Sequence, residues 1–85
     1  MSIITGKTAV AAGGTSAWSD TVGVSNINVG VSSEGNYVIE YDLGSDIVYG
    51  ISVTGGPKNQ AIIVAKANQV RVRAEATALD YEVFG

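Results

Sequence analysis

The chain of 85 residues contains no cysteine, no histidine and a single proline. Without cysteine it has no disulfide and no thiolate ligand for zinc, and without histidine it lacks the commonest transition-metal ligand and the commonest general base. A domain of this length buries only about 60–65% of the surface that its unfolded chain exposes, so small domains usually rely on disulfides, metals or self-association. Self-association is the route that the sequence leaves open.

Charged residues are also scarce, at 15% of the chain, whereas hydrophobic residues make up 46%. Because an average soluble domain is about 25% charged, either another molecule covers part of the surface or the surface is unusually rich in Ser, Thr and Asn. The net charge of −3 disfavours nonspecific nucleic-acid binding. No apolar run has the length of a membrane-spanning helix, and the first residues lack the pattern of a signal peptide. We therefore expect neither a nucleic acid nor a membrane as partner.

The second half of the chain shows a clear alternation of apolar and polar residues. It occurs in Ile47–Val53, Val70–Ala74 and Leu79–Val83. A period of two places successive side chains on opposite faces of a strand, so each segment is predicted to be a strand with one buried face. With eleven glycines for turns, the sequence predicts one all-β domain over residues 1–85. We expect a small β-sandwich or barrel of about seven or eight short, mainly antiparallel strands.

Four further segments are assigned by the same rules. Residues 1–12 are expected to form an N-terminal arm or an edge strand, and the alternation in Trp18–Val24 predicts another strand. Glu34-Gly35-Asn36 is typical of a hairpin turn. Ala61–Lys66 is apolar on both parities, which favours a central strand covered on both faces, and a helix over Ala61–Ala78 is the alternative.

Acidic and basic residues are separated along the chain. Four acids come before four bases: Glu34, Glu40, Asp42 and Asp46, then Lys58, Lys66, Arg71 and Arg73. On neighbouring strands of one subunit they would pair across the ladder. On different subunits they would form a charge-complementary contact. We favour pairing within one subunit, and the two arrangements are compatible.

No segment has the residues and spacing of a known catalytic or metal site. Asp42–Asp46 places two carboxylates around a glycine but lacks the ligand pattern of a calcium loop. Gly55–Lys58 lacks the spacing of a phosphate-binding loop. Acid pairs on one strand face, such as Asp80 and Glu82, lack a scaffold for glycoside hydrolysis. We therefore expect no enzymatic activity, no catalytic residue, no cofactor and no metal.

Aromatic residues near loops and chain ends are the best candidates for contacts between subunits, because aromatic side chains are enriched in interfaces. The three tyrosines at positions 37, 41 and 49 are instead expected in or near the core. The residues expected at an interface are Ile3, Ile4, Trp18, Lys58, Arg71, Arg73 and Phe84.

Three segments, Gly14–Val22 (GTSAWSDTV), Val70–Ala74 (VRVRA) and Leu79–Gly85 (LDYEVFG), resemble small structural proteins of tailed bacteriophage particles. Such proteins include capsid decoration (cement) proteins and small tail or head-fibre components. The resemblance implies a non-enzymatic virion protein, made in the cytoplasm of a bacterial host, that stabilises an assembled shell. It also implies a homo-oligomer, with a trimer favoured, bound to a major capsid or other virion protein. The alternative is a small binding module, either lectin-like through Trp18 or a receptor-binding tail component.

Overall fold

The chain folds into eight β-strands in a computed structural model, which describes residues 2–32 and 34–85. In chain order the strands are β1 (Ile3–Val10), β2 (Ser19–Asp20), β3 (Ile27–Val31), β4 (Gly35–Asp42), β5 (Val48–Gly56), β6 (Gln60–Val64), β7 (Gln69–Ala74) and β8 (Leu79–Phe84). The described residues contain no helix. The all-β prediction is confirmed, and the helical alternative for Ala61–Ala78 is wrong.

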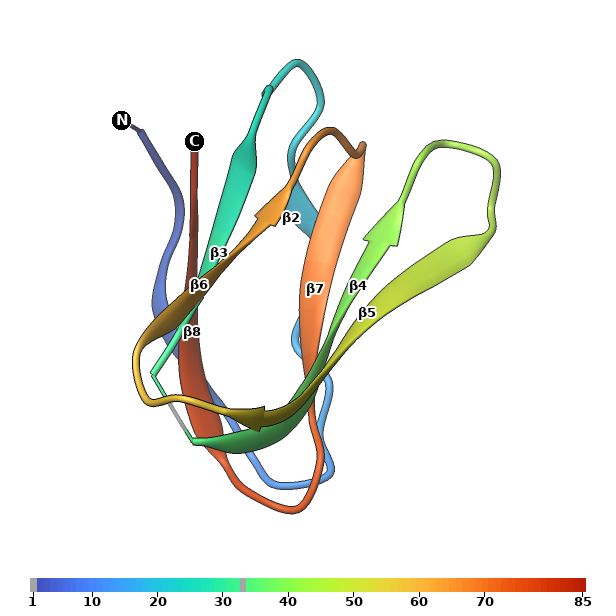
Figure 1. Ribbon diagram of the computed structural model, residues 1–85. Helices are drawn as coiled ribbons and strands as arrows, with labels where there is room; N and C mark the ends of the chain where they lie inside the picture. The colour runs from blue at the N-terminus through green and yellow to red at the C-terminus, as the bar shows by residue number, and fades with distance from the viewer. Residues whose placement is uncertain (1, 33) are drawn as a thin grey trace.

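The strands form two four-stranded antiparallel sheets. The strand order is β1-β8-β3-β6 in one sheet and β2-β7-β4-β5 in the other. Figure 1 shows β8, β3 and β6 on one side of the molecule and β7, β4 and β5 on the other. The fold is therefore a small β-sandwich, in which one face of each sheet is covered by the other sheet.

The inner faces of the two sheets supply the hydrophobic core. Its fully buried side chains include Val29, Ile39, Val72 and Val83. Within β7 and β8, buried residues alternate with more exposed ones, as the period of two requires. The predicted buried face of each of these two strands is confirmed.

Strand β6 lies at a sheet edge, so the prediction of a central strand over Ala61–Lys66 is wrong. Among residues 2–32 and 34–85, β6 pairs with β3 alone. Val64 is buried and Ile62 packs against the core, whereas Ile63 is 63% exposed on the opposite face. The apolar residues at successive positions of β6 therefore form one face that packs on the core and a second apolar face that is exposed.

The strand predicted over Trp18–Val24 is reduced to the two residues of β2, and its buried side chains are polar. Thr21 is fully buried, and its hydroxyl donates a hydrogen bond of 2.7 Å to the Ala67 carbonyl. Ser19 is also buried and hydrogen-bonded. Val22, in the turn that follows, is 68% exposed. A buried hydroxyl with a hydrogen-bond partner avoids most of the free-energy cost of leaving water. Hydrophobic alternation alone cannot predict such a buried polar residue.

The Glu34-Gly35-Asn36 segment leads from one sheet to the other, so the hairpin predicted there is wrong. β3 already pairs with β8 on one side and with β6 on the other, which leaves it no free edge for β4. β4 pairs instead with β5 and β7 in the opposite sheet. Gly35 begins β4 with a φ of +113°, a conformation that glycine adopts readily.

Most of the N-terminal segment belongs to the edge strand β1. It pairs with β8, and its register shifts twice between Ile3 and Thr8. Ser2 and Gly85 exchange two backbone hydrogen bonds of 2.7 and 2.9 Å, which places the two chain ends side by side (Figure 1). The described part of this segment is thus held by its own sandwich.

Replacing Ile39 by alanine should destabilise the fold strongly, because Ile39 is fully buried between the sheets. We expect Ile39→Ala to lower the free energy of unfolding by about 2–5 kcal/mol. The matched control is Ile63→Ala, where the exposed side chain should change it by less than about 0.5 kcal/mol. Urea denaturation followed by circular dichroism measures both. Equal losses would contradict the exposed face assigned to β6.

Burial raises the pKa of Tyr37 above its ordinary value of 10.0. Because the unfolded chain releases this proton at a lower pH than the folded chain, the contribution of Tyr37 to stability is complete below about pH 10 and is lost as the pH rises above it. Tyr37→Phe should therefore make the unfolding temperature fall less steeply above about pH 10. Thermal unfolding of both proteins across this pH range measures the difference. If the unfolding temperature falls equally steeply with pH in both, the pKa of Tyr37 is the same in the folded and unfolded chains.

Candidate interaction surfaces

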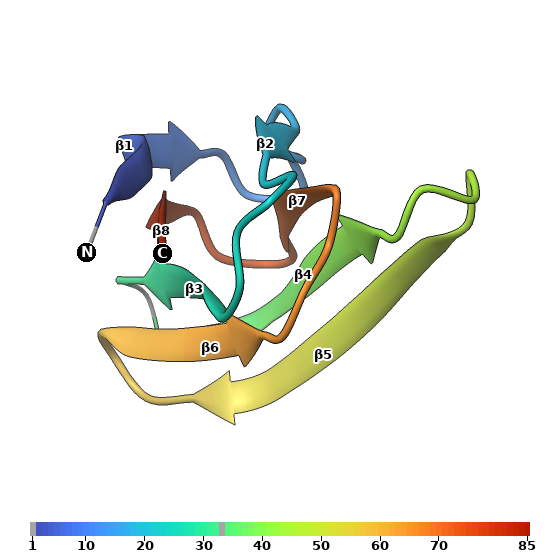
Figure 2. The same ribbon diagram turned by 90° about the horizontal axis from the view of Figure 1, so that it is seen from above.

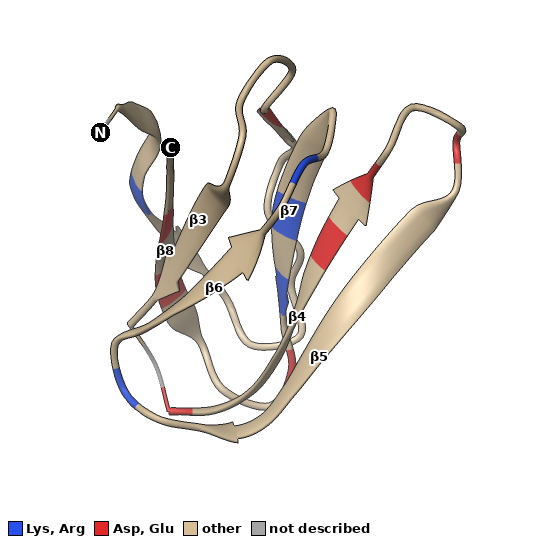
Figure 3. Cartoon of the chain, turned by 45° about the horizontal axis from the view of Figure 1, so that its top comes forward, with Lys and Arg blue, Asp and Glu red and all other residues tan. Residues whose placement is uncertain are grey.

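An arginine cluster lies on the outer face of the β2-β7-β4-β5 sheet, formed by Trp18, Glu40, Arg71 and Arg73. Arg71 lies directly opposite Glu40 across the β7–β4 pair, and its Nε donates a hydrogen bond of 2.8 Å to Glu40 Oε1. The Nε of Arg73 is 3.8 Å from Glu40 Oε2. The Arg71 guanidinium also lies 4.2 Å from the centre of the Trp18 ring, within the range of a cation–π contact. Figure 3 shows the basic positions of β7 beside the acidic positions of β4.

The alternation along β7 places both arginines in this cluster. Val70 and Val72 point into the core, so Arg71 and Arg73 project from the other face. The side chains of Arg71 and Glu40 are only 28% and 16% exposed, and partial shielding from water strengthens such a pair relative to a solvated one. The pairing favoured within one subunit is confirmed for Glu40 and the two arginines.

The other residues expected at an interface lie outside the arginine cluster. Ile3 and Phe84 face each other across β1 and β8, where Ile3 is 63% exposed and Phe84 is half-buried. Ile4 is partly buried and packs against the core. Lys58 is exposed in the turn between β5 and β6. The structure therefore brings Trp18 together with the two arginines and Ile3 together with Phe84, whereas Ile4 packs against the core and Lys58 lies in a separate turn.

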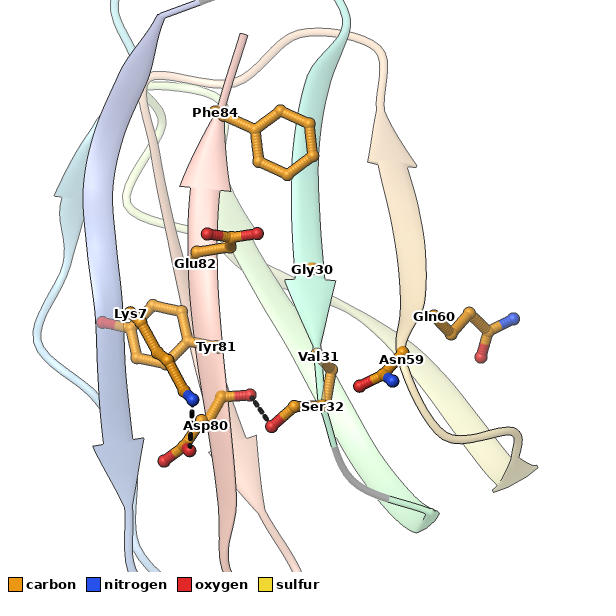
Figure 4. A pocket seen from close by; sticks show the side chains of 10 residues that line it. All are labelled: Lys7, Gly30, Val31, Ser32, Asn59, Gln60, Asp80, Tyr81, Glu82 and Phe84. Atoms are coloured by element: carbon orange, nitrogen blue, oxygen red, sulfur yellow. Dashed lines mark hydrogen bonds and ion pairs between the residues drawn. The ribbon is translucent and has the colours of Figure 1, made fainter.

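A shallow groove of about 340 Å³ lies on the outer face of the β1-β8-β3-β6 sheet. Its lining includes Lys7, Asp80, Glu82 and Phe84, which Figure 4 shows along β1 and β8. Lys7 Nζ is 3.6 Å from Asp80 Oδ2. Gly30 contributes to the hollow, because a Cβ atom there would lie 3.3 Å from Glu82 Cγ. The groove combines an aromatic ring with carboxylates and is open to polar ligands.

The end of the β4–β5 hairpin exposes four large apolar side chains. They are Leu43 (51% exposed), Ile47 (55%), Val48 (45%) and Tyr49 (41%), and we call them the apolar hairpin end. Figure 2 shows this hairpin extending beyond the strands of the opposite sheet. Val48 and Tyr49 project from opposite faces of β5, so these side chains surround the end of the hairpin. Several exposed apolar side chains in one region are typical of surfaces that bind another molecule.

Sequence reasoning missed this surface, because it assigned Tyr49 to the core together with Tyr37 and Tyr41. The structure buries Tyr37 and half-buries Tyr41, whereas Tyr49 stacks on Tyr41, with a centroid distance of 5.6 Å, and stays exposed. β5 has nine residues and β6, at the edge of the opposite sheet, has five. The alternation of Ile47, Tyr49 and Ile51 signals an apolar strand face, but it does not indicate whether a second sheet covers that face.

The turn after β4 is stabilised by a side chain that the sequence also offered as a weak metal ligand. Asp42 Oδ1 accepts a hydrogen bond of 2.7 Å from the Gly44 amide. Within residues 2–32 and 34–85, no group of three or more acidic side chains is placed to hold a metal ion. The same residues include no helix of sufficient length and apolar character to cross a bilayer.

Removing the charge of Glu40 should destabilise the domain, because Glu40 is the carboxylate that both cluster arginines approach. We expect Glu40→Gln to lower the free energy of unfolding by about 1–3 kcal/mol. Asp80→Asn is the matched control, since its 3.6 Å pair with Lys7 is solvated, and it should cost less than about 0.5 kcal/mol. Chemical denaturation of the parent and the two variants measures these free energies of unfolding. A Glu40→Gln variant as stable as the parent would mean that the cluster contributes nothing net.

Comparison of the chain with protein-family models, with curated proteins and with solved structures finds no match. The surfaces described above are therefore interpreted from their own geometry and chemistry.

Proposed function

We propose that the chain is a non-enzymatic structural protein of a virus particle, of the capsid decoration or cement type, which stabilises an assembled shell by contacts between subunits. The observation that carries this proposal is the apolar hairpin end, which the fold holds in solvent. Apolar patches of this kind favour protein–protein contact. The resemblance of three segments to phage structural proteins supplies the class of partner.

Strand β7 supports the hairpin along β4 as far as Asp42, which limits the conformational freedom lost on binding. Glu40 in β4 is held by Arg71 in β7. At the end of β4, the Asp42 carbonyl accepts a hydrogen bond of 2.8 Å from the Asn68 amide. Tyr41 and Tyr49 stack across the hairpin. A binding element that is already ordered keeps more of the free energy gained by burying its apolar surface.

In this role the chain would act by mass action. A protein that binds the assembled shell and not its free subunits stabilises the shell by RT ln(1 + [L]/Kd) per site. Each Leu, Ile or Val side chain that becomes fully buried contributes about 1.5–3 kcal/mol. The proposed partners are copies of the chain, as a trimer in line with the resemblance, and a major capsid or other virion protein. The proposed location is the virion, after synthesis in the cytoplasm of the bacterial host.

Virus particles purified from a culture that expresses the gene should contain the chain at a fixed copy number relative to the shell protein. Quantitative mass spectrometry of banded particles measures this ratio. When added to shells stripped of the chain, Ile47→Ser should bind about tenfold or more weakly than the parent, because it removes most of one apolar contact. Its matched control, Ile63→Ser, alters an equally apolar and exposed side chain on β6 and should bind like the parent.

Two results would contradict the proposal. One is the absence of the chain from purified particles, or a copy number that varies between preparations. The other is equal shell binding by Ile47→Ser and the parent, which would separate the apolar hairpin end from assembly.

The second candidate function is a small binding module, and the groove beside Phe84 is the observation that favours it. The groove places the aromatic ring of Phe84 near the carboxylate of Glu82, with Asp80 further along β8. Trp18 is a poorer platform for a glycan than its sequence context implied, because the Arg71 guanidinium lies over its ring. A glycan array separates the two functions, since a decoration protein gives no signal on it.

A further inference from the structure

The sandwich has four edge strands, and three of them have features that discourage pairing with another chain. β1 carries Lys7 and two register shifts. β2 has only two residues. β6 has five residues and is flanked by Lys58 and Lys66. Short strands, irregular register and lysines are the features by which natural sheets protect their edges.

The fourth edge strand, β5, is the longest of the four, and its register shift lies at one end, between Val53 and Gly56. Its nine residues include no charged side chain and no proline. Its pairing with β4 is regular from Val48 to Val53. Among the described residues β5 pairs with β4 alone, so the backbone N–H and C=O groups on its other side are available to another strand.

We propose that β5 pairs with β5 of a second copy of this chain, in antiparallel orientation about a two-fold axis. The pairing joins two β2-β7-β4-β5 sheets into one continuous sheet of eight strands. The inference deepens the proposed function by naming one partner, and it rests on that function in assuming that the chain works in an assembly. It replaces the trimer that the resemblance implies with a two-fold pair.

The absence of charge on β5 allows a second copy of the chain to occupy this edge. Each chain carries a net charge of −3, so two copies repel each other wherever their acidic faces meet. β5 is a surface without charge, as Figure 3 shows. Its outward-facing neighbour Glu40, across the β4–β5 pair, is already neutralised by Arg71. An uncharged edge is complementary to itself.

The side chains of β5 are also complementary to themselves under two-fold symmetry, which an isologous contact requires. An axis at Ile51 places Ile51 beside its own symmetry mate and Tyr49 beside Val53 of the partner subunit. Aromatic and β-branched residues that face each other across an antiparallel pair stabilise it. Ile51 and Val53 already pack against the core of their own subunit, so the core would continue across the joined sheet. Leu43 and Ile47 lie beyond this pairing and stay free for a shell protein.

A lysine on β5 tests the proposal directly. Ser52 is exposed and lies next to the proposed axis, so Ser52→Lys brings two like charges together in the pair and leaves the single sandwich intact. By size-exclusion chromatography with light scattering, we expect the parent to have the mass of two copies, or of an even multiple. At the same concentration Ser52→Lys should have the mass of one sandwich or half that of the parent, with a dissociation constant at least tenfold higher. Ser25→Lys, which introduces the same charge at an exposed turn, should behave like the parent.

Hydrogen exchange gives a second measurement on the same proteins. In the parent, the β5 amides that point away from β4 should exchange slowly, whereas in Ser52→Lys they should exchange at the rate of exposed amides. Circular dichroism checks that the variant is folded. If it is not, Thr54→Lys, also exposed on β5, takes its place.

Three outcomes would overturn the pairing: a monomeric parent, a parent with the mass of a closed trimer, or a Ser52→Lys variant with the mass of the parent. Each leaves the proposed function to be decided separately, because the particle assay with Ile47→Ser does not depend on β5 pairing. Conversely, a two-fold pair that is absent from purified particles would support the inference and contradict the proposed function.

Discussion

The burial of one face of each sheet against the other is the constraint on which the structure depends. Val29 and Val83 in one sheet and Ile39 and Val72 in the other have no exposed surface, and the chain has no disulfide to replace this packing. Because strand side chains alternate, burial of these residues determines what the outer faces carry. The position of Arg71 on the outer face beside Glu40 is thus a consequence of the burial of its neighbour Val72.

The same constraint leaves part of the molecule uncovered. Two four-stranded sheets use most of the 85 residues, and the short β6 does not extend along the full length of β5. The turn end of the β4–β5 hairpin is therefore apolar and solvent-exposed, although β4 pairs with β7 as far as Asp42. An element that is held on one side and uncovered on the other is well suited to contact a neighbour, and the proposed function depends on it.

Individual residues show why the site was only partly predictable. Arg71 and Trp18 were expected at an interface, and they do lie together, but Arg71 interacts with Glu40 and the Trp18 ring of its own subunit. Their proximity arises from the pairing of β7 with β2 and β4, which brings together segments far apart in the chain. Tyr49 was expected in the core because its pattern matches that of Tyr37. Tyr37 lies on the central strand β4 and is buried, whereas Tyr49 lies on the edge strand β5 and is exposed.

The sequence by itself determined the all-β class and the buried faces of β7 and β8, because a period of two is a local property of the chain. Only the tertiary structure decided the strand order, the crossing from β3 to β4 between the sheets, and the edge positions of β5 and β6. It also decided that Thr21 is buried while Ile63 and Tyr49 are exposed. These features depend on pairing and coverage by distant segments, and alternation along a strand specifies two faces without specifying what covers either of them.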